Sequence, residues 1–587
     1  MAALTITRER GGWWHAYVCP AHGVELDHGD LIGDPFPSTG AACRYGCRMD
    51  TEAVRGARTV LAHQAAAQRL RHLACGGSAE RSEALRLLLE YAELYASLPS
   101  KHPGAASWML HGRLFHQALT EAIWAVAVSH AARTLAAHRG MRTELGTLLP
   151  FLRSLGNCAG EAHAELRHKG ESRSNYTAWL AAAEMCCRSA ALAIEGVEPD
   201  TVELADHYGL FEHMRTAVHE DGWEWEGSTY YHLFVLHAYL LALRGSRPER
   251  LPGDIAGVLG AMTVALAGIA TPAGTLPALH DGPYRREAQS AEICEVAALA
   301  DQLFAGAPLS AVASAAARDV ATELPADLPG WFSGPSLPAR ALRRSFSDTG
   351  YAVFRSAGVH ALLDAGPHGG GHGHLDKLSL YLYADDGTAW QPDPGQVPYA
   401  HRTYRTYYAG TKAHPTFRVD DSEQAPCDAV LDGDTGRCVG AYDGVSAMRQ
   451  VVTGSPYLLD ILVLEADDER LLTAQLRPGT DLDVVAQGPG RSHTVWGEGG
   501  SGTAVMTGQH VSRPPAEFTV VAHPGPADDP ARTCRGVDWS TTGRRAVFAS
   551  VYQSAEATPP VRRVSLSERT VHIDLADGTV ATHSIGR

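Results

Sequence analysis

The spacing of hydrophobic residues changes once along this chain, and that change constrains the fold more than any other feature. Across residues 78–321, apolar side chains recur at three- and four-residue intervals, which is typical of packed helices. The clearest runs are 83–98, 108–137, 176–194 and 230–243. Beyond residue 340 the period becomes two, as in strands. We therefore predict a helical region followed by a β region.

Two segments of the β region have the pattern of a hairpin. Residues 378–383 lead into an Asp-Gly turn at 386–387, and residues 571–575 lead into another at 577–578. Further strands are predicted at 457–465 and 545–552. The chain therefore reads as an α+β multidomain protein that ends in an antiparallel β-sandwich.

A proline- and glycine-rich segment separates the two regions. Residues 324–338 contain four prolines and two glycines and cannot continue a helix. We predict a small N-terminal Cys/His segment at 1–60, a helical domain at 61–325, a linker at 326–342 and a β domain at 343–587.

Composition excludes several classes of protein. With 20% charged and 45% hydrophobic residues, the 587-residue chain is not disordered, and a net charge of −16 argues against nucleic-acid or membrane partners. The apolar run at 255–270 is shorter than the roughly 20 residues that cross a bilayer, and predicts a buried helix. The N-terminus lacks a secretory signal. The 11 cysteines, an odd number in a long chain, do not indicate a disulfide framework. We expect a cytoplasmic protein; a secreted form with its leader removed, and a homodimer, stay open.

A glycine-rich loop at 366–380 carries the densest cluster of chemically active residues. His368, His372 and His374 lie within it, and Asp393 and His414 follow. Paired histidines, a carboxylate and a distant histidine form a suitable ligand set for zinc. The alternative is a glycine-rich turn with solvated imidazoles.

Three polar segments are candidates for ligand binding. Tyrosines interleave with Arg402 and Arg405, which suit anion recognition. In the helical region, 221–232 and 171–179 each open a helix, the second with Asn175 at its start. For these two segments, plain helix capping is the alternative interpretation.

A second metal site is predicted near the N-terminus. Cys19, His22, Cys43 and Cys47 offer four ligands in a short segment rich in glycine and proline. Such a segment is too small for its own core, so structural zinc is the natural interpretation. Buried, reduced thiols are the alternative.

The order of these motifs resembles that of the heparinase II/III-like polysaccharide lyases, a group that includes oligoalginate lyases. It runs from Asn at a helix start through Glu-x-Ser-x-x-Tyr-His and Gly-Pro-His-Gly-x-x-His-x-His-x-Asp-x-Leu-Ser to Tyr-x5-His-x-Thr, over roughly 108–424. The resemblance implies an incomplete (α/α) toroid joined to a β-sandwich, and cleavage beside a uronic acid by β-elimination.

The resemblance also implies residue roles. Asn175, Tyr231, His372 and Tyr408 would be catalytic. His374, Asp393 and His414 would hold zinc. Substrate-binding positions would be Tyr176, Glu226, His368, Arg402 and Arg405. Tyr176 stands where many relatives carry His, Tyr230 adjoins Tyr231, and Pro415 replaces a commoner Asn.

Two other functions remain open at this level. A glycoside hydrolase would need two carboxylates, which Asp221, Glu224 and Glu226 could supply. A non-catalytic glycan-binding protein would need none. For the lyase, the expected partner is an anionic polysaccharide or oligosaccharide such as alginate, hyaluronan or heparan, cleaved exolytically.

Overall fold

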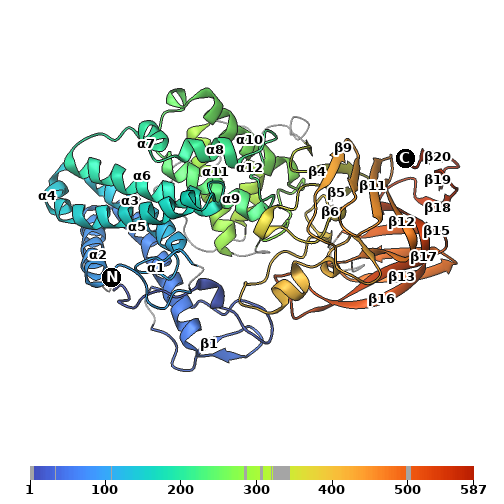
Figure 1. The fold of residues 1–587 in the computed structure, drawn as a ribbon, viewed down its shortest axis with the longest axis horizontal. Coiled ribbons are helices and arrows are strands. Elements are labelled where there is room, and N and C mark those ends of the chain that lie inside the picture. Colours follow the sequence, from blue (N-terminus) through green and yellow to red (C-terminus); the bar gives the residue numbers. More distant parts are fainter. Residues whose placement is uncertain are drawn as a thin grey trace.

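The computed structural model describes residues 5–32, 35–106, 109–282, 287–304, 308–318, 320, 344–497 and 504–586. Its helical region and its β region lie side by side, with the N-terminal segment below both (Figure 1). The predicted linker at 326–342 falls outside the described residues. The order of helices before strands confirms the predicted fold class.

The helices of the first region enclose one large hydrophobic core. They are α1 (Glu52–Ala74), α2 (Ser78–Ser97), α3 (Ala118–Ala136), α4 (Arg142–Leu145), α5 (Leu149–His168), α6 (Asn175–Glu195), α7 (Thr201–His207), α8 (Leu210–Ala217), α9 (Thr229–Ala242), α10 (Gly253–Ile269), α11 (Glu287–Leu303) and α12 (Ser310–Ala317). Helices α6 and α9 are buried over most of their length because they are apolar on nearly every face. The run at 255–270 is the buried helix α10, as predicted.

The β region contains three antiparallel sheets. The first comprises β3 (Ser345–Phe346), β4 (Tyr351–Ser356), β5 (Val359–Asp364), β6 (Ser379–Ala384) and β7 (Ala389–Gln391). The second comprises β8 (Phe417–Val419), β9 (Ala429–Asp432), β10 (Thr435–Cys438), β11 (Val445–Thr453), β12 (Leu458–Leu476), β13 (Leu482–Gly488), β14 (Arg491–Trp496), β15 (Met506–Arg513), β16 (Glu517–Pro524) and β17 (Thr533–Ser554). The third comprises β18 (Val561–Leu566), β19 (Thr570–Leu575) and β20 (Val580–Ser584).

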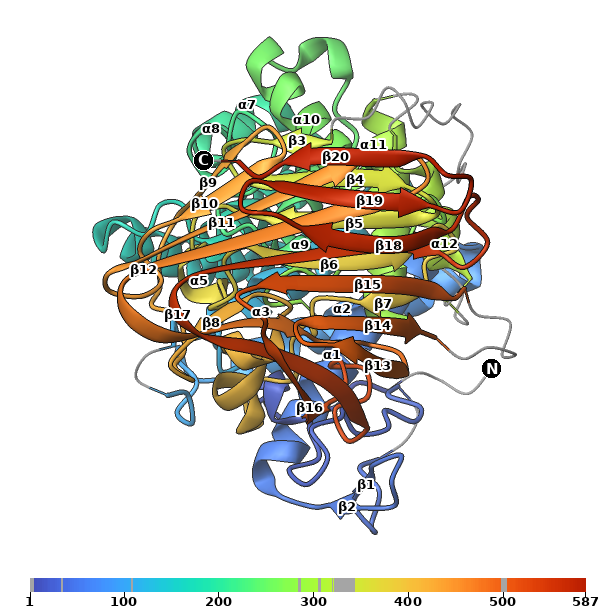
Figure 2. The ribbon, with the colours of Figure 1, turned by 90° about the vertical axis from the view of Figure 1, so that its right-hand side faces the viewer.

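These sheets are stacked in layers away from the helices. One core of buried side chains lies between the first and second sheets, and a smaller core lies between the second and third. Figure 2 shows the third sheet, β18–β20, on the outer face. Both predicted Asp-Gly turns are present: Gly387 and Gly578 each have φ of 89°. The preceding Asp386 and Asp577 each accept a 2.9 Å bond from the backbone N–H two residues on.

A mixed cluster joins the helical region to the first sheet. Trp223 and Leu279 pack there against Phe346, Tyr351 and strand residues of β4–β6. Beside them, Asp221 accepts 2.9 Å bonds from the backbone N–H groups of Asp348 and Thr349. This joint fixes the β sheet against the loop that precedes α9.

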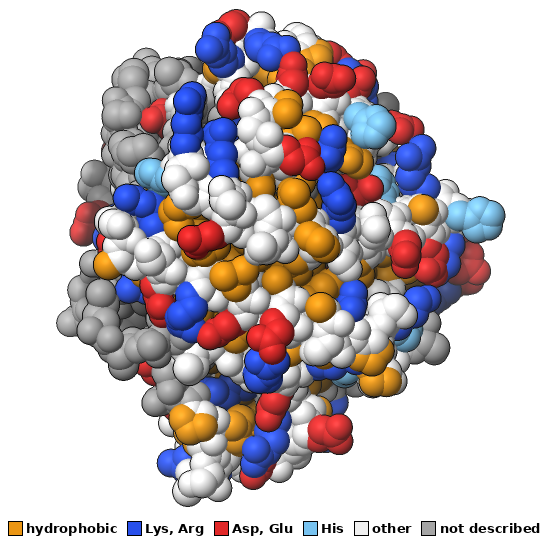
Figure 3. Space-filling model, turned by 90° about the vertical axis from the view of Figure 1, so that its left-hand side faces the viewer, with side chains coloured by type: hydrophobic (Ala, Val, Ile, Leu, Met, Phe, Trp, Pro, Cys, Tyr) orange, Lys and Arg blue, Asp and Glu red, His pale blue; other side chains and the backbone are white. Residues whose placement is uncertain are grey.

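Charge is dispersed over the outer helical face. Among the coloured side chains of Figure 3, Lys and Arg alternate with Asp and Glu over this face. A ligand that carries negative charge therefore has to be recognised by a local group of donors. Within the described residues, every helix is too short or too polar to cross a bilayer.

Candidate functional site

Two helix N-termini bring the predicted helical residues to the domain joint. Ser174 caps α6, so Asn175 becomes its first residue and is only 2% exposed. Ser228 caps α9 by accepting the backbone N–H of Tyr231 at 3.2 Å. The same Ser228 hydroxyl donates to the carbonyl oxygen of Asp281 at 2.6 Å. One serine thus fixes α9 and the loop that carries Asp281.

The carboxylate of Asp281 is the centre of the site. Its Oδ2 atom lies 2.9 Å from His372 Nδ1 and accepts hydroxyl bonds of 2.8 Å from Tyr399 and from Tyr404. Its Oδ1 atom lies 3.0 Å from His374 Nε2. Burial alone would raise the pKa of Asp281, but the bonds from His372 and His374 outweigh it and hold the pKa well below its usual range. Asp281 is therefore a buried, ionised anchor.

Tyr231 and His372 meet face to face at this centre. Their ring centroids are 3.6 Å apart and their planes are tilted by 20°. The Tyr231 hydroxyl lies 2.9 Å from that of Tyr399, which lies 3.0 Å from His372 Nδ1. Burial raises the pKa of both tyrosines well above 10, so both are protonated at rest.

His372 reaches solvent, because its side chain is 20% exposed, and Tyr399 is also partly exposed. Burial would lower the pKa of His372, but the nearby carboxylates of Glu226 and Asp281 raise it overall. Its Nε2 atom lies 3.8 Å from Glu226 Oε1. At rest the imidazole is thus biased toward its protonated form.

Asn175 and Glu226 form a hydrogen-bonded pair beside His372. Asn175 Nδ2 donates to Glu226 Oε2 at 3.1 Å. Burial raises the pKa of Glu226, against the lowering effects of His372 and Asn175. Asn175 Oδ1 is buried and has no hydrogen-bond partner among the described residues. The amide therefore has bonding capacity left for a ligand.

The predicted β-domain metal ligands do come together. His374, Asp376, Asp393 and His414 are all buried and place their ligand atoms within 4.8 Å of one another. His374 Nδ1 is 3.1 Å from His414 Nε2, which is 3.8 Å from Asp393 Oδ1. Asp376 was not among the predicted ligands, although it stands in the His-x-His-x-Asp motif.

The second nitrogen of each histidine in this group is already oriented. His374 Nε2 bonds to Asp281, and His414 Nδ1 bonds to the carbonyl oxygen of Gly410 at 2.8 Å. Metal-bound histidines in proteins are held in this way, so the residues present fit a zinc ion. Asp281 consequently links the metal group to the Tyr231–His372 pair.

A neighbouring ionic network shares Asp376 with this group. The Lys377 Nζ atom is 3.6 Å from Asp376 and 3.5 Å from Asp364. His280 lies 3.4 Å from Asp364, and these carboxylates outweigh burial to raise the pKa of His280 to about 9. The cations of this network favour an internal salt-bridge cluster here over a further metal site.

Several predicted residues lie outside this centre. Tyr408 is fully buried, and its hydroxyl donates to the carbonyl oxygen of Gly525 at 2.7 Å, so it does not line an open site. The Tyr176 hydroxyl accepts a 3.0 Å bond from Gln117. His368 is half-buried at the edge of the loop, and Arg402 and Arg405 are exposed nearby.

Sequence reasoning missed Asp281, Tyr399 and Tyr404. The tyrosines lie in the tyrosine-rich segment already singled out, where the π-helical turn η7 (Tyr404–Tyr408) aims Tyr404 at Asp281 and Tyr408 at Gly525. Asp281 carries only a weak signal, because an Asp-Gly pair after a helix reads as an ordinary turn.

An aromatic residue stands at the edge of the site. Trp225 is partly exposed, donates its indole N–H to the carbonyl oxygen of Arg173 at 2.7 Å, and has the Arg173 guanidinium 4.8 Å from its ring centroid. Gly370 of the histidine loop approaches this ring, and a Cβ there would lie 2.8 Å from it. A flat ring beside a cation suits a sugar with a negative substituent.

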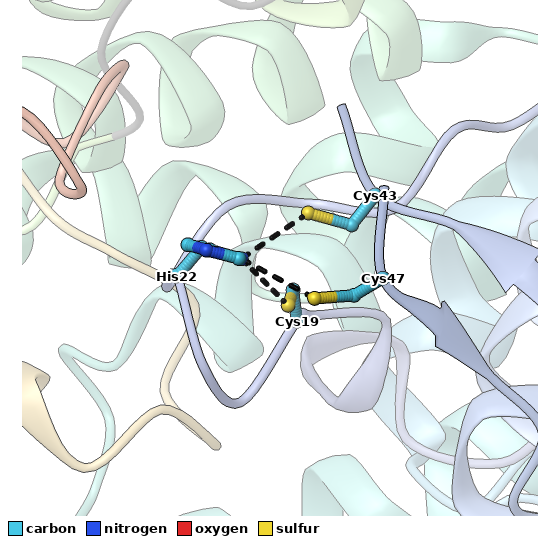
Figure 4. Close-up of side chains that lie close together, drawn as sticks. All are labelled: Cys19, His22, Cys43 and Cys47. Carbon is cyan, nitrogen blue, oxygen red and sulfur yellow. Dashed lines mark hydrogen bonds between the residues drawn. The ribbon is translucent and has the colours of Figure 1, made fainter. Parts of the chain in front are cut away.

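The four predicted N-terminal ligands also converge. Cys19, His22, Cys43 and Cys47 point toward a common centre (Figure 4). Cys19 and Cys43 are buried, whereas His22 and Cys47 are partly exposed. This cluster is separate from the Asp281 centre and belongs to the N-terminal segment.

Comparison with known proteins agrees with this geometry. Residues 338–450, which include the histidine loop and the β-domain metal group, match the family described as heparinase II/III-like, C-terminal. This segment is similar to the C-terminal domain of that family. No curated protein was found to match it.

Solved structures share the fold over nearly the whole chain. One titled heparinase III has a TM-score of 0.65 at 13% identity and covers 96% of this chain and 88% of its own. Heparan sulfate lyase HepC from Pedobacter heparinus has a TM-score of 0.58 at 14% identity and covers 96% and 85%. The predicted toroid joined to a β-sandwich is therefore confirmed.

Proposed function

We propose that this protein is a polysaccharide lyase that cleaves beside a uronic acid by β-elimination. The observation that carries the proposal is the meeting of Asn175, Tyr231 and His372 at the joint of the two domains. Domain interfaces are favoured places for ligand sites. The heparinase II/III-like match over 338–450 and the shared fold with heparinase III support it.

β-Elimination first needs the uronate carboxylate to be neutralised, because the proton on carbon 5 is only weakly acidic. The Asn175 amide and the His372 imidazole, whose pKa is raised, lie beside the place where this group would bind. Together they would stabilise charge as it moves toward an enolate-like form. Because the chain has a net negative charge, these local groups would have to attract the anionic substrate.

The second need is proton transfer. In the proposed reaction the C5–H bond and the bond to the leaving oxygen break, and a C4=C5 double bond forms. Tyr231 takes the carbon proton as a phenolate and returns it to the leaving oxygen. The phenolate forms when Tyr231 passes its own proton to Tyr399, 2.9 Å away, as Tyr399 passes its proton to the Asp281 carboxylate, 2.8 Å away. The positive charge of His372 against its ring favours that ionisation.

The β-domain group would hold zinc in a structural role. His374, Asp393 and His414, with Asp376, supply nitrogen and oxygen ligands that suit this ion. Bound zinc would brace the loop that carries His372, two residues from His374. Metal analysis of the purified protein tests this, and a chain without zinc at this group would contradict it.

The substrate class we propose is an anionic uronate oligosaccharide, of the alginate, hyaluronan or heparan type, cleaved from one end. Exposed Arg173, Arg402 and Arg405 around the site would meet its further negative groups. The ring of His15, from the N-terminal segment, lies 4.2 Å from that of Tyr399 and closes one side of the site, which supports exolytic action.

A panel of uronate polymers and oligomers, followed by ultraviolet absorbance and product sizing, tests the proposal. β-Elimination leaves a conjugated double bond that absorbs, whereas hydrolysis or simple binding does not. A hydrolase is disfavoured by the structure because Asp221 is engaged by the β domain and Glu224 is fully buried. Cleavage without new absorbance would establish the hydrolase, and binding without cleavage would establish a glycan-binding protein.

A further inference from the structure

The N-terminal segment has very little hydrophobic core with which to hold its shape. Its two strands, β1 (Ala41–Ala42) and β2 (Arg48–Met49), have two residues each. Its buried apolar cluster is small and includes two of the cysteines themselves. Segments of this size usually depend on a disulfide or a metal ion for stability. None of the 11 cysteines forms a disulfide in this structure.

The four ligands have the spacing of a tetrahedral zinc site. His22 Nδ1 lies 3.4 Å from Cys19 Sγ, 3.6 Å from Cys43 Sγ and 3.6 Å from Cys47 Sγ (Figure 4). With Zn–S bonds of about 2.3 Å and Zn–N bonds of about 2.0 Å, each nitrogen-to-sulfur edge of a tetrahedron would be about 3.5 Å. Three sulfurs therefore surround one imidazole nitrogen at the separations that a shared zinc ion imposes.

The residues between these ligands contact the β domain. Arg44 donates to Asp529 Oδ1 at 2.9 Å and to the Asp528 carbonyl oxygen at 2.6 Å, and the Tyr45 hydroxyl also bonds to Asp529. Pro20, next to Cys19, accepts a 3.1 Å bond from His401 through its carbonyl oxygen. A Cβ at Gly23 would lie 3.2 Å from the His401 ring, so the backbone approaches the β domain closely there.

The other side of the segment belongs to the helical domain. Gly12 donates to the carbonyl oxygen of Gly56 at 2.8 Å, and the chain passes from Cys47 through the Thr51 cap directly into α1. The segment lies below both domains in Figure 1. It therefore bridges the two domains on the side of the site where His15 covers Tyr399.

We propose that Cys19, His22, Cys43 and Cys47 bind a zinc ion, and that this zinc knuckle latches the β-domain segment 399–408 to the helical domain. Both partners of the Arg44–Asp529 pair are partly exposed, and such pairs contribute little to stability unless their partners are held in place. Zinc holds Arg44, Tyr45 and Pro20 in place. The latch in turn holds Tyr399 and Tyr404 against Asp281.

Cobalt substitution tests the metal site on the unmutated chain. Co²⁺ bound by thiolates gives a sulfur-to-metal charge-transfer absorption, which the histidine and aspartate ligands of the β-domain group cannot give. We expect this absorption in the cobalt-loaded protein. The double variant Cys43→Ser/Cys47→Ser should lose the absorption, and it should also contain one zinc ion fewer per chain. Cys75→Ser, an exposed cysteine elsewhere, is the matched control and should keep both. Cobalt-loaded protein without the absorption, or a double variant with full zinc, would overturn the site.

Amide hydrogen exchange tests the latch. We expect exchange over 399–408 to become at least about 10-fold faster in the double variant. Arg44→Ala should speed it as well while keeping its zinc, which covers the case in which the double variant does not fold. Unchanged exchange in both variants would overturn the latch. The spectra and the exchange rates are independent of the proposed lyase function.

Discussion

Burial and charge pairing act on different sides of the candidate site. On the helical side, Asn175 is an uncharged amide, burial keeps Tyr231 protonated, and burial raises the pKa of Glu226. On the strand side, His372 is biased toward its cation and stands against the ionised Asp281. On one side burial thus opposes charge, and on the other side charges are paired.

This difference indicates a division of labour. A neutral amide can receive the carboxylate of a substrate without repelling it, and it leaves proton transfer to the stacked tyrosine and histidine. Asp281 connects the two sides, because it lies in the loop between α10 and α11 and bonds to His372, His374, Tyr399 and Tyr404. The predictions below separate the groups that react from those that hold them in position.

The largest effect is expected for the stacked tyrosine. Tyr231→Phe should lower turnover at least about 100-fold with affinity nearly intact, since it removes a proton-transfer group and leaves the ring against His372. Tyr230→Phe is the matched control and should keep most of its turnover. Steady-state absorbance kinetics on both variants decides. If the losses are reversed, Tyr230 carries the proton and our assignment is wrong.

A smaller effect, on stability as well as activity, is expected for the metal group. His414→Ala should remove the β-domain zinc and leave the carboxylates of Asp376 and Asp393 to repel each other. The melting temperature should fall by several degrees, and the free energy of unfolding by about 2 kcal/mol. His510→Ala, another buried histidine of the β domain, should also lower stability but leave the zinc content unchanged. Equal zinc in both variants would contradict the metal assignment.

The sequence was sufficient for the architecture and for part of the site. The change of period and the two Asp-Gly turns predicted the helix-to-strand order. The motifs placed His374, Asp393 and His414 in one predicted ligand set, to which the structure adds Asp376. These signals are local, so one sequence carries them. The roles given to individual residues stay predictions.

What the sequence could not supply depends on tertiary contacts. Asp281 reaches His372 across 91 residues and Tyr404 across 123, so no local pattern reveals either contact. Tyr404 and Tyr408 look equivalent in the sequence, and the turn η7 alone sends one to the site and the other to Gly525. A tyrosine-rich segment indicates that a site is near without showing which hydroxyl enters it.

Tyr399 and Tyr408 therefore allow a comparison between a tyrosine that enters the site and one that does not. Tyr399→Phe should lower turnover about 10-fold, because Tyr231 and Asp281 each lose a hydrogen-bond partner. Tyr408→Phe should leave turnover within about 2-fold and lower stability by about 1 kcal/mol, since only the Gly525 carbonyl loses its donor. Kinetics with melting curves on both proteins provides the test. A larger kinetic loss for Tyr408→Phe would restore it to the site.

The smallest effect is expected for His237, a buried charged residue of the helical domain that is not part of the site. His237 on α9 faces Glu292 at 3.1 Å and Glu295 at 3.3 Å, both on α11, and Glu295 is also paired with Arg71 of α1 at 2.6 Å. Burial would lower the pKa of His237, but the two carboxylates raise it to about 9 from 6.5. A raised pKa means that the folded state binds the proton more tightly, so this stabilisation is complete below pH 6.5 and is lost as the pH rises through about 9. We expect the free energy of unfolding to fall over that interval, and the fall to be absent in His237→Gln. Denaturant unfolding of both proteins across this pH range measures it, and an identical pH dependence would show that His237 is not charged in the fold.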